Sequence, residues 1–359
     1  MFLKRNALFV HSVVSFGTMN IFNNRGESVV NEKDFELLYK QLNDAAIQIE
    51  QHEHIPYLDA LGLAMEYLFF GESSLNFDDI LLHKLNGIYE SIDLDTFEQI
   101  DIRKGVQLAI IKGMKHTTQS QHMITPESIS LLIGYLAEKF TKDLEHVRVL
   151  DPVVGTGSLL LTVLSQLHKE TKAYSAEIDP TLIKLAVAYT NLQKSEVEFF
   201  HQDALRPLFL DPVDLVVADL PVGYYPDDVH AEGFELNRED SHAYAHELLI
   251  EQSLQYMKPG GYGIFVIPDT LFDDDTTGNL NRFINQEAYI VGLLRLPESA
   301  FKTKKQVKSI FILQKRGHNS KMPKEPLLVQ LPSFKNAQAM ESIMKQINQW
   351  FEKYEQDTN

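Results

Sequence analysis

The fold of this chain is decided by residues 147–158, which read VRVLDPVVGTGS. The first four residues of this stretch are rich in β-branched and apolar side chains and predict a short buried strand. A turn with two glycines follows at once, and an apolar helical pattern begins near Ser158. A strand that passes through a glycine turn into a helix is the context in which such a loop binds a ligand through its backbone.

Strands and helices continue to alternate around this stretch, from about residue 119 to residue 333. This alternation is typical of an open, doubly wound α/β sheet, which binds its ligands at the carboxyl ends of its strands. Seven strands are predicted, at residues 147–150, 173–176, 197–200, 214–218, 262–267, 289–294 and 307–313. Helices are predicted between them, at residues 127–140, 157–167, 180–192, 242–257 and 278–286.

The region before the sheet, residues 31–118, has a helical period throughout. Its apolar side chains recur at steps of three and four residues, which predicts a bundle of about four helices with Asp95 as the cap of the last one. No ligand set stands out there, so a structural or docking role is expected. We also expect a poorly ordered leader at residues 1–30, with Met19 favoured over Met1 as the working start, and a C-terminal helix at residues 334–359.

The composition limits the classes of function. The 359 residues include 33 Lys and Arg against 50 Asp and Glu, a formal net charge of −17. A chain this acidic lacks the basic surface with which a protein grips duplex DNA unaided, so a role on nucleic acid needs a local basic patch or a partner. The sequence has no cysteine, and its histidines show no spacing typical of a zinc site. No stretch is apolar enough for a membrane helix, and we expect a cytoplasmic protein.

The glycine loop does not match a phosphate-binding loop. A Walker loop requires Lys followed by Ser or Thr, and a dinucleotide fingerprint requires a third glycine where this chain has Leu160. Asp151, at the start of the loop, would repel a phosphate. Its carboxylate instead suits a ligand that carries cationic groups, such as the amino acid part of S-adenosylmethionine (SAM).

Acidic residues also follow the next two predicted strands. Glu177 lies about 20 residues after Gly155, where a carboxylate accepts hydrogen bonds from ribose hydroxyls. Asp203 follows the third strand and is placed to accept a hydrogen bond from an adenine amino group. Each carboxylate alone is equally consistent with a helix cap or a solvated loop. Three acids at three successive strand ends, however, predict a SAM site.

The fourth strand leads into residues 219–225, DLPVGYY, where the chain resembles a known family. This loop resembles the Asn/Asp-Pro-Pro-Tyr/Phe motif of the amino-group DNA methyltransferases. Within them the chain is most similar to the YtxK-like adenine-specific methyltransferases, which are related to the methylase subunits of type I restriction systems. Further matches lie at residues 125–126, 254–268, 294–301 and 309–313. The resemblance implies a Rossmann-like, seven-stranded class I methyltransferase sheet preceded by an all-α helical bundle.

The resemblance also implies the residues of the site. The SAM-binding residues would be Thr125, Asp151, Gly155, Thr156, Gly157, Glu177, Asp203, Ala204 and Asp219. The catalytic residues would be Asp219, Leu220, Pro221 and Tyr224. The Asp219 side chain and the Leu220 carbonyl would accept the two hydrogens of the target amine, a mechanism that requires no metal.

Two positions depart from the family motif. Leu220 replaces its first proline, and Val222 stands where the family has the aromatic ring that stacks on a flipped base. Extruding a base from duplex DNA costs a few kcal/mol, and stacking on an aromatic ring returns roughly 1–3 kcal/mol of this. Contact with a valine side chain returns less free energy than stacking on an aromatic ring does. Either Tyr224 or Tyr225 therefore takes the place of the ring, or the substrate needs no flipping, or activity on DNA is weak or absent.

The leading hypothesis is a SAM-dependent N-methyltransferase that acts on the N6 amine of adenine in DNA. Two alternatives stay open: a methyltransferase for RNA, a small molecule or a protein amide, and a SAM-binding regulatory or scaffold protein with reduced catalysis. DNA is expected to bind weakly or with the help of a partner, and a protein partner could bind through the helical bundle. The candidate phosphate-facing residues are Lys302, Lys304, Lys305 and Lys308.

Overall fold

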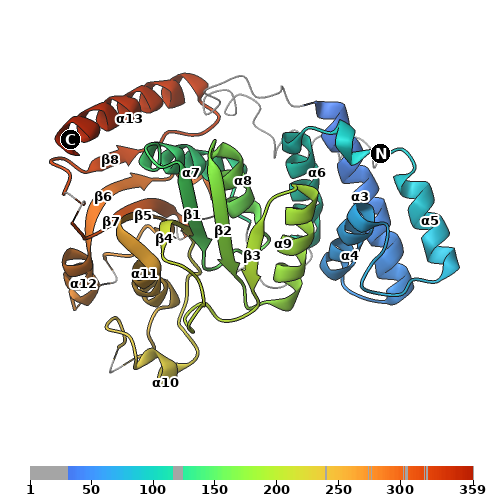
Figure 1. Cartoon of the computed structure of the whole chain (residues 1–359), viewed down its shortest axis with the longest axis horizontal. Helices are drawn as coiled ribbons and strands as arrows, with labels where there is room; N and C mark the ends of the chain where they lie inside the picture. Colours follow the sequence, from blue (N-terminus) through green and yellow to red (C-terminus); the bar gives the residue numbers. More distant parts are fainter. Residues whose placement is uncertain are drawn as a thin grey trace.

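The computed structural model describes residues 31–115, 124–238, 241–273, 275, 277–301, 303, 306–318, 320 and 322–358. They form a helical bundle at the N-terminal end and a mixed sheet with helices on both of its faces (Figure 1). The expected leader at residues 1–30 lies outside the described residues. Within the described ranges, no helix combines the length and the apolar character that a membrane span requires.

The bundle is built from helices that begin at side-chain caps or short turns. Its α-helices are α3 (Glu32–Glu53), α4 (Tyr57–Phe70), α5 (Asp79–Tyr89) and α6 (Gln99–Met114). Asp78 caps α5 by accepting the backbone N–H of Leu81 at 2.8 Å. The cap expected at Asp95 is wrong, because Asp93 accepts the N–H of Asp95 and caps a short 3₁₀ turn instead. Helix α6 begins only afterwards, at Gln99.

The described strands form one eight-stranded sheet in the order β3-β2-β1-β4-β5-β7-β6-β8. Their bounds are β1 (His146–Asp151), β2 (Glu170–Ala176), β3 (Val197–Phe200), β4 (Val213–Asp219), β5 (Met257–Pro268), β6 (Ala288–Arg295), β7 (Lys308–Lys315) and β8 (Leu327–Gln330). Strand β7 runs antiparallel to β5 and β6, and the other paired strands are parallel. The carboxyl ends of β1 to β4 therefore meet at one edge of the sheet.

The sheet has one strand more than the seven expected. The first seven strands each overlap a predicted run, although β2 and β5 begin three and five residues before their predicted starts, whereas β8 was not anticipated. This strand has four residues, lies between Pro326 and Pro332, and is the edge strand beside β6. Prolines often bracket edge strands because they cannot donate to a hydrogen-bond ladder. The doubly wound α/β class itself is confirmed.

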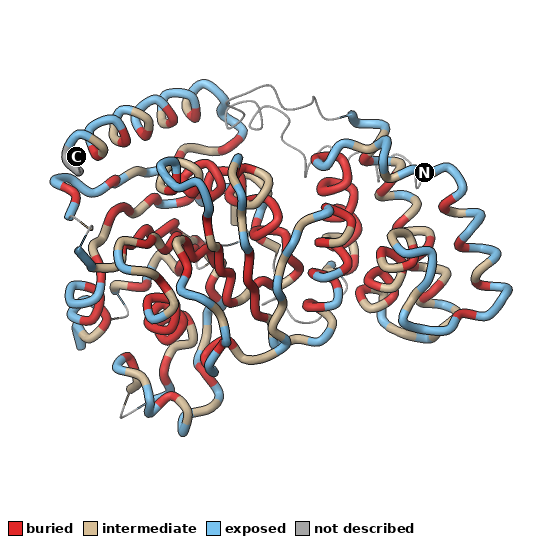
Figure 2. Tube along the Cα trace, in the orientation of Figure 1, coloured by how far each residue is buried: buried red, intermediate tan, exposed pale blue. Residues whose placement is uncertain are grey.

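Helices cover both faces of the sheet. They are α7 (Glu127–Phe140), α8 (Ser158–Gln166), α9 (Pro180–Leu192), α10 (Asp228–Ala231), α11 (Ala245–Tyr256), α12 (Asn279–Glu287) and α13 (Ala337–Thr358). Helices α7, α8 and α13 share one apolar core with the sheet, and α11 and α12 share another with its opposite face. Strand β1 alternates between them, since Val149 belongs to the first core and Leu150 to the second. The buried segments in Figure 2 accordingly run between the layers.

The bundle is joined to the sheet domain by a shared apolar core. Leu185 and Tyr189 of α9 are fully buried among side chains of the bundle. The Tyr189 hydroxyl also donates to the carbonyl of Arg103 in α6 at 3.1 Å. Because α9 begins shortly after β2, the bundle packs on a helix that starts at the edge where β1 to β4 end.

We expect Leu185→Ala to reduce the free energy of unfolding by about 2–5 kcal/mol, because it opens a cavity in this shared core. Val187→Ala, on the same helix but 38% exposed, is the matched control and should cost less than about 1 kcal/mol. Urea unfolding followed by circular dichroism measures both variants. Equal losses would contradict a core that the bundle and α9 share.

Candidate functional site

Three loops that carry predicted site residues are neighbours in the structure. Strand β1 lies between β2 and β4 in the sheet, so the loops after Asp151, Ala176 and Asp219 begin side by side. The backbone N–H of Gly155 donates to the Glu177 carboxylate at 2.9 Å, and the carboxylates of Glu177 and Asp219 both raise the pKa of the Asp151 carboxyl. The glycine loop, the acid after β2 and the loop at residues 219–225 thus form one candidate site.

The glycine loop turns the chain from β1 into α8. Gly155 and Gly157 have φ angles of 56° and 85°, in the left-handed region that favours glycine. A Cβ placed on Gly155 would meet no described atom within 4 Å, so this residue faces open space. Thr156 is buried between the two glycines, with its hydroxyl 3.2 Å from that of Ser158. The loop therefore leaves room for a ligand against its backbone at Gly155.

The carboxylate of Glu177 ties the glycine loop to the end of β2. Its Oε2 accepts the backbone N–H of Gly155 at 2.9 Å, and its Oε1 accepts those of Ile178 and Asp179 at the same distance. These three donors fix the carboxylate in one orientation, while Oε2 keeps a lone pair for a further donor. Ile178 exposes 65% of its surface beside it, an apolar side chain that sequence reasoning missed.

Asp151 is buried at the end of β1, with only 1% of its surface exposed. Burial raises the pKa of its carboxyl to about 8, and the carboxylates of Glu177 and Asp219 add to this increase. A hydrogen bond from the backbone N–H of Val153, at 3.1 Å, opposes it. The site therefore favours a ligand that brings positive charge to Asp151.

Asp203 and Ala204 lie in the loop after β3. Asp203 Oδ1 accepts the backbone N–H of Leu205 at 2.9 Å, and its Oδ2 accepts the hydroxyl of Tyr225 at 2.5 Å. Ala204 is buried. Burial, together with the hydrogen bond to Asp203, raises the pKa of the Tyr225 hydroxyl, which therefore remains a donor. This contact joins the loop after β3 to the loop at 219–225, a link that the sequence does not reveal.

The structure explains why leucine replaces the first proline of the family motif. The Leu220 side chain is fully buried in the core between the sheet and α11. Its backbone N–H donates to the carbonyl of Val266 in β5 at 3.0 Å. A proline has no N–H to donate, so leucine adds a bond between this loop and β5 that the usual residue cannot make. Pro221, the next residue, is exposed.

The two tyrosines of the loop differ in their environment. Tyr225 is buried and held by Asp203, so in this arrangement it cannot serve as an exposed stacking surface. Tyr224 is 58% exposed, and its ring stacks on Tyr244 with a centroid distance of 4.8 Å and an interplanar angle of 11°. Tyr244 stacks in turn on His246. Tyr224 is therefore the candidate for the aromatic ring that the motif lacks.

Both carboxylate oxygens of Asp219 are engaged by side chains. Thr125 Oγ1 donates to Oδ2 at 2.8 Å, and Lys308 Nζ donates to Oδ1. Sequence reasoning assigned Thr125 to the SAM pocket and Lys308 to a phosphate-facing patch, but not to Asp219. The other three lysines of that patch, Lys302, Lys304 and Lys305, lie outside the described residues.

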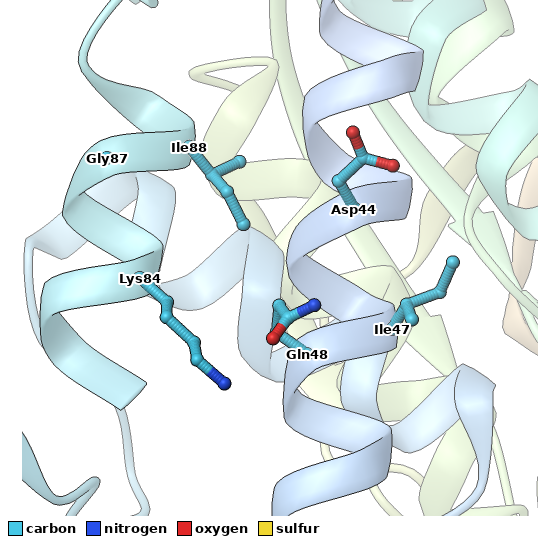
Figure 3. A pocket seen from close by; sticks show the side chains of 6 residues that line it. All are labelled: Asp44, Ile47, Gln48, Lys84, Gly87 and Ile88. Carbon is cyan, nitrogen blue, oxygen red and sulfur yellow. The ribbon is translucent and has the colours of Figure 1, made fainter. Parts of the chain in front are cut away.

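A pocket of about 480 Å³ lies between α3 and α5 of the bundle (Figure 3). Its lining residues are Asp44, Ile47, Gln48, Lys84, Gly87 and Ile88. It combines one carboxylate with one ammonium group but contains no glycine turn, and α5 lies on the side of the bundle away from the sheet (Figure 1). This pocket is therefore separate from the three loops of the candidate site.

Comparison with protein families identifies the class to which this arrangement belongs. Residues 111–358 match the family model described as N-6 DNA methylase. The chain belongs to the N-6 DNA methylase family. Residues 36–114 match the model of the YtxK N-terminal helical domain, so the resemblance to YtxK-like methyltransferases expected from the sequence is confirmed.

One related protein and two solved structures are similar to this chain over most of its length. The uncharacterized protein YtxK of Bacillus subtilis is 46% identical over 323 residues, which span 88% of this chain and 97% of YtxK. A crystal structure assigned to the class I SAM-dependent methyltransferases, from Listeria monocytogenes, is 41% identical with a TM-score of 0.84, over 89% of this chain and 100% of that chain. A structure from a type I restriction–modification system shares the fold, with 16% identity and a TM-score of 0.56 over 94% of this chain and 82% of that chain.

The cofactor of this family member is SAM, as the family and the class I methyltransferase fold imply. The residues at the edge of the sheet fit it. Gly155 offers open space beside the backbone, the buried Asp151 favours a cationic group, and Glu177 presents a fixed carboxylate. Which of these residues contacts which part of SAM stays a prediction.

We expect SAM binding to release a proton from Asp151. The cationic amino group of SAM favours the ionised carboxyl, whose pKa is about 8 in the cofactor-free protein. At pH 7 the binding enthalpy should therefore depend on the ionisation enthalpy of the buffer. Titration calorimetry in phosphate and in Tris measures this, and Asp151→Asn should lose the buffer dependence together with about tenfold or more in affinity.

Without cofactor, Asp151→Asn should be more stable than wild type at alkaline pH. A carboxyl whose folded pKa is raised opposes folding once it ionises, so its contribution to wild-type stability falls as the pH rises from about 4 to about 8. The asparagine variant has no ionisable group at this position, so its stability lacks this dependence on pH. Thermal unfolding at pH 6 and pH 9 measures the difference, with Asp211→Asn as the exposed control. A variant that melts below wild type at pH 9 would contradict the raised pKa.

Proposed function

We propose that the chain transfers the methyl group of SAM to the exocyclic N6 amine of adenine in DNA. The observation that carries this proposal is the orientation of Asp219 at the end of β4, where Thr125 holds Oδ2 of its carboxylate beside the glycine loop. Membership of the N-6 DNA methylase family supports the same reaction class. The proposed SAM contacts are Thr125, Asp151, Gly155, Thr156, Gly157, Glu177, Asp203, Ala204 and Asp219.

The protein must make a weak nucleophile reactive, because the lone pair of an exocyclic amine is delocalised into its ring. When bound, SAM supplies a methyl group activated by the adjacent sulfonium. Asp219 Oδ1 and the Leu220 carbonyl accept the two amine hydrogens, which orients the lone pair and stabilises the positive charge that develops on the nitrogen. Thr125 keeps the carboxylate in place, and Pro221 restricts the loop, so that both acceptors are positioned before the substrate arrives.

Tyr224 supplies the aromatic surface that Val222 cannot provide. Both side chains are more than half exposed, and both lie in the loop that contains Asp219. The ring of Tyr244 backs that of Tyr224 and keeps it in one orientation, so little side-chain freedom is lost when a base stacks on it. The target adenine therefore stacks on Tyr224 in this proposal.

Binding to DNA is weak or needs a partner. The net charge of −17 opposes the approach of a phosphate backbone, and Lys308 is already paired with Asp219. A protein partner on the N-terminal bundle would supply positive charge. The division into a bundle at residues 31–118, a methyltransferase domain at 119–333 and a C-terminal helix at 334–359 is part of this proposal.

Single-stranded RNA or DNA is the second candidate substrate, and the exposed Val222 favours it. A base that is already unstacked needs no energy for extrusion from a duplex, so weaker stacking on the protein matters less. The chemistry at Asp219 is the same for both candidates.

Transfer of tritium from labelled SAM to duplex DNA, single-stranded DNA and RNA tests the proposal. We expect label in N6-methyladenine, and a rate about 10²–10³-fold lower for Asp219→Ala, because one preorganised group that stabilises the developing charge is lost. Asp228→Ala, an exposed carboxylate nearby in the sequence, is the control. No incorporation into any nucleic acid, or equal rates for wild type and Asp219→Ala, would refute the proposal. Label in single strands alone would support the second candidate.

The role of the exposed ring is tested separately. Tyr224→Ala should lower kcat/KM for the nucleic acid by about 5- to 150-fold, which corresponds to roughly 1–3 kcal/mol of lost stacking. Tyr224→Phe keeps the ring and should remain near wild type. Steady-state kinetics measures both, with SAM affinity unchanged in each. If phenylalanine were as damaging as alanine, the stacking role would be wrong.

A further inference from the structure

The side-chain ammonium group of Lys308 contacts the carboxylate of Asp219, which is the same group that binds the target amine in the proposed mechanism. Lys308 is the first residue of β7, and its Nζ donates a hydrogen bond to Asp219 Oδ1. Thr125 occupies Oδ2. A target amine therefore cannot approach Oδ1 from the position of Lys308 until the lysine moves away.

The contact between Lys308 and Asp219 is mostly buried, with side chains that are 20% and 19% exposed. The backbone of Lys308 is anchored, because it pairs with Pro268 of β5 and its carbonyl accepts the N–H of Leu296 at 3.2 Å. Departure of the ammonium group therefore requires rotation of the flexible side chain and no change in the sheet.

Two further carboxyl groups, those of Asp151 and Glu177, belong to the same acidic cluster as this ion pair. The carboxylates of Glu177 and Asp219 both act on the buried Asp151, and Lys308 neutralises one of them. When bound at the candidate site, SAM would bring a sulfonium and an ammonium group to the same edge of the sheet. Since like charges repel more strongly where water is partly excluded, Lys308 is held less tightly by Asp219 once these cations are bound nearby.

We propose that Lys308 is a placeholder for the target amine. In the cofactor-free protein it neutralises Asp219 and fixes its carboxylate, and it withdraws when SAM binds, which frees Oδ1 for the substrate. The amine acceptor is then available only in the cofactor-loaded protein. The identity of the target amine rests on the proposed function, whereas the coupling between Lys308 and SAM does not.

A second ion pair of the same kind provides a matched control. Lys258 Nζ donates to Asp214 Oδ1 at 2.6 Å, near the start of β4 and thus at the opposite end of that strand from Asp219. Its side chains are 36% and 13% exposed. If Lys308 only stabilised the sheet, its removal should affect the protein as the removal of Lys258 does.

Calorimetric titration with SAM compares wild type with Lys308→Met, Lys308→Arg and Lys258→Met. Methionine keeps the length of the side chain and removes its charge, so Lys308→Met should bind SAM about 3- to 30-fold more tightly, as expected when one partly screened positive charge near a cation is lost. Lys308→Arg keeps the charge and should bind like wild type, and so should Lys258→Met. Thermal unfolding shows that each variant is folded, and Lys308→Gln is the second neutral variant.

Unchanged or weaker SAM binding by the folded neutral variants would overturn the proposal, because Lys308 would then be a structural residue or a SAM contact. Mass spectrometry after incubation of wild type with SAM alone should show Lys308 unmodified. A methyl group on Lys308 would also overturn the placeholder role, since the lysine would itself be an acceptor. None of these measurements uses a nucleic acid. They therefore test the role of Lys308 even if the proposed methylation of adenine is wrong.

Discussion

The geometry of the site depends on one carboxylate, that of Glu177, which accepts three backbone N–H groups from two loops. One donor is Gly155 in the glycine loop, and the other two belong to the segment that leads from β2 into α9. A loop with two left-handed glycines is intrinsically free to move, and this anchor holds it at the edge of the sheet. Support for the anchor comes from farther away, because the bundle packs on α9.

Three acidic residues, Asp151, Glu177 and Asp219, lie at this edge of the sheet, an arrangement that does not by itself stabilise the fold. Asp151 is buried in a position that raises its pKa, close to two further carboxylates. Such perturbed groups are typical of functional sites, where a ligand provides the compensating charge. In the cofactor-free protein, Thr125 and Lys308 each bind one carboxylate oxygen of Asp219. The protein therefore folds with an acidic site whose Asp219 carboxylate is not left unpaired.

Sequence reasoning succeeds here where a local signal decides the structure. The helices Glu127–Phe140 and Pro180–Leu192 were predicted to the residue, because prolines mark both starts and Asp179 caps the second. The loop residues at three strand ends were likewise placed at one edge of the sheet. Sequence reasoning fails where contacts between distant segments decide the structure. Strand β8, for example, forms by pairing with β6 at the edge of the sheet. The pairing of Lys308 with Asp219 depends on the register of β7, which no pattern in the neighbouring lysines encodes.

The core shared by α9 and the bundle has a consequence for how this architecture can change. Leu182, Leu185 and Tyr189 on α9 are shielded from water by the bundle. A shortened relative without those helices would expose an apolar stripe on its sheet domain and would tend to aggregate. Only a compensating exchange of that stripe for polar residues would keep it in solution, so the two halves of the molecule are constrained to diverge together.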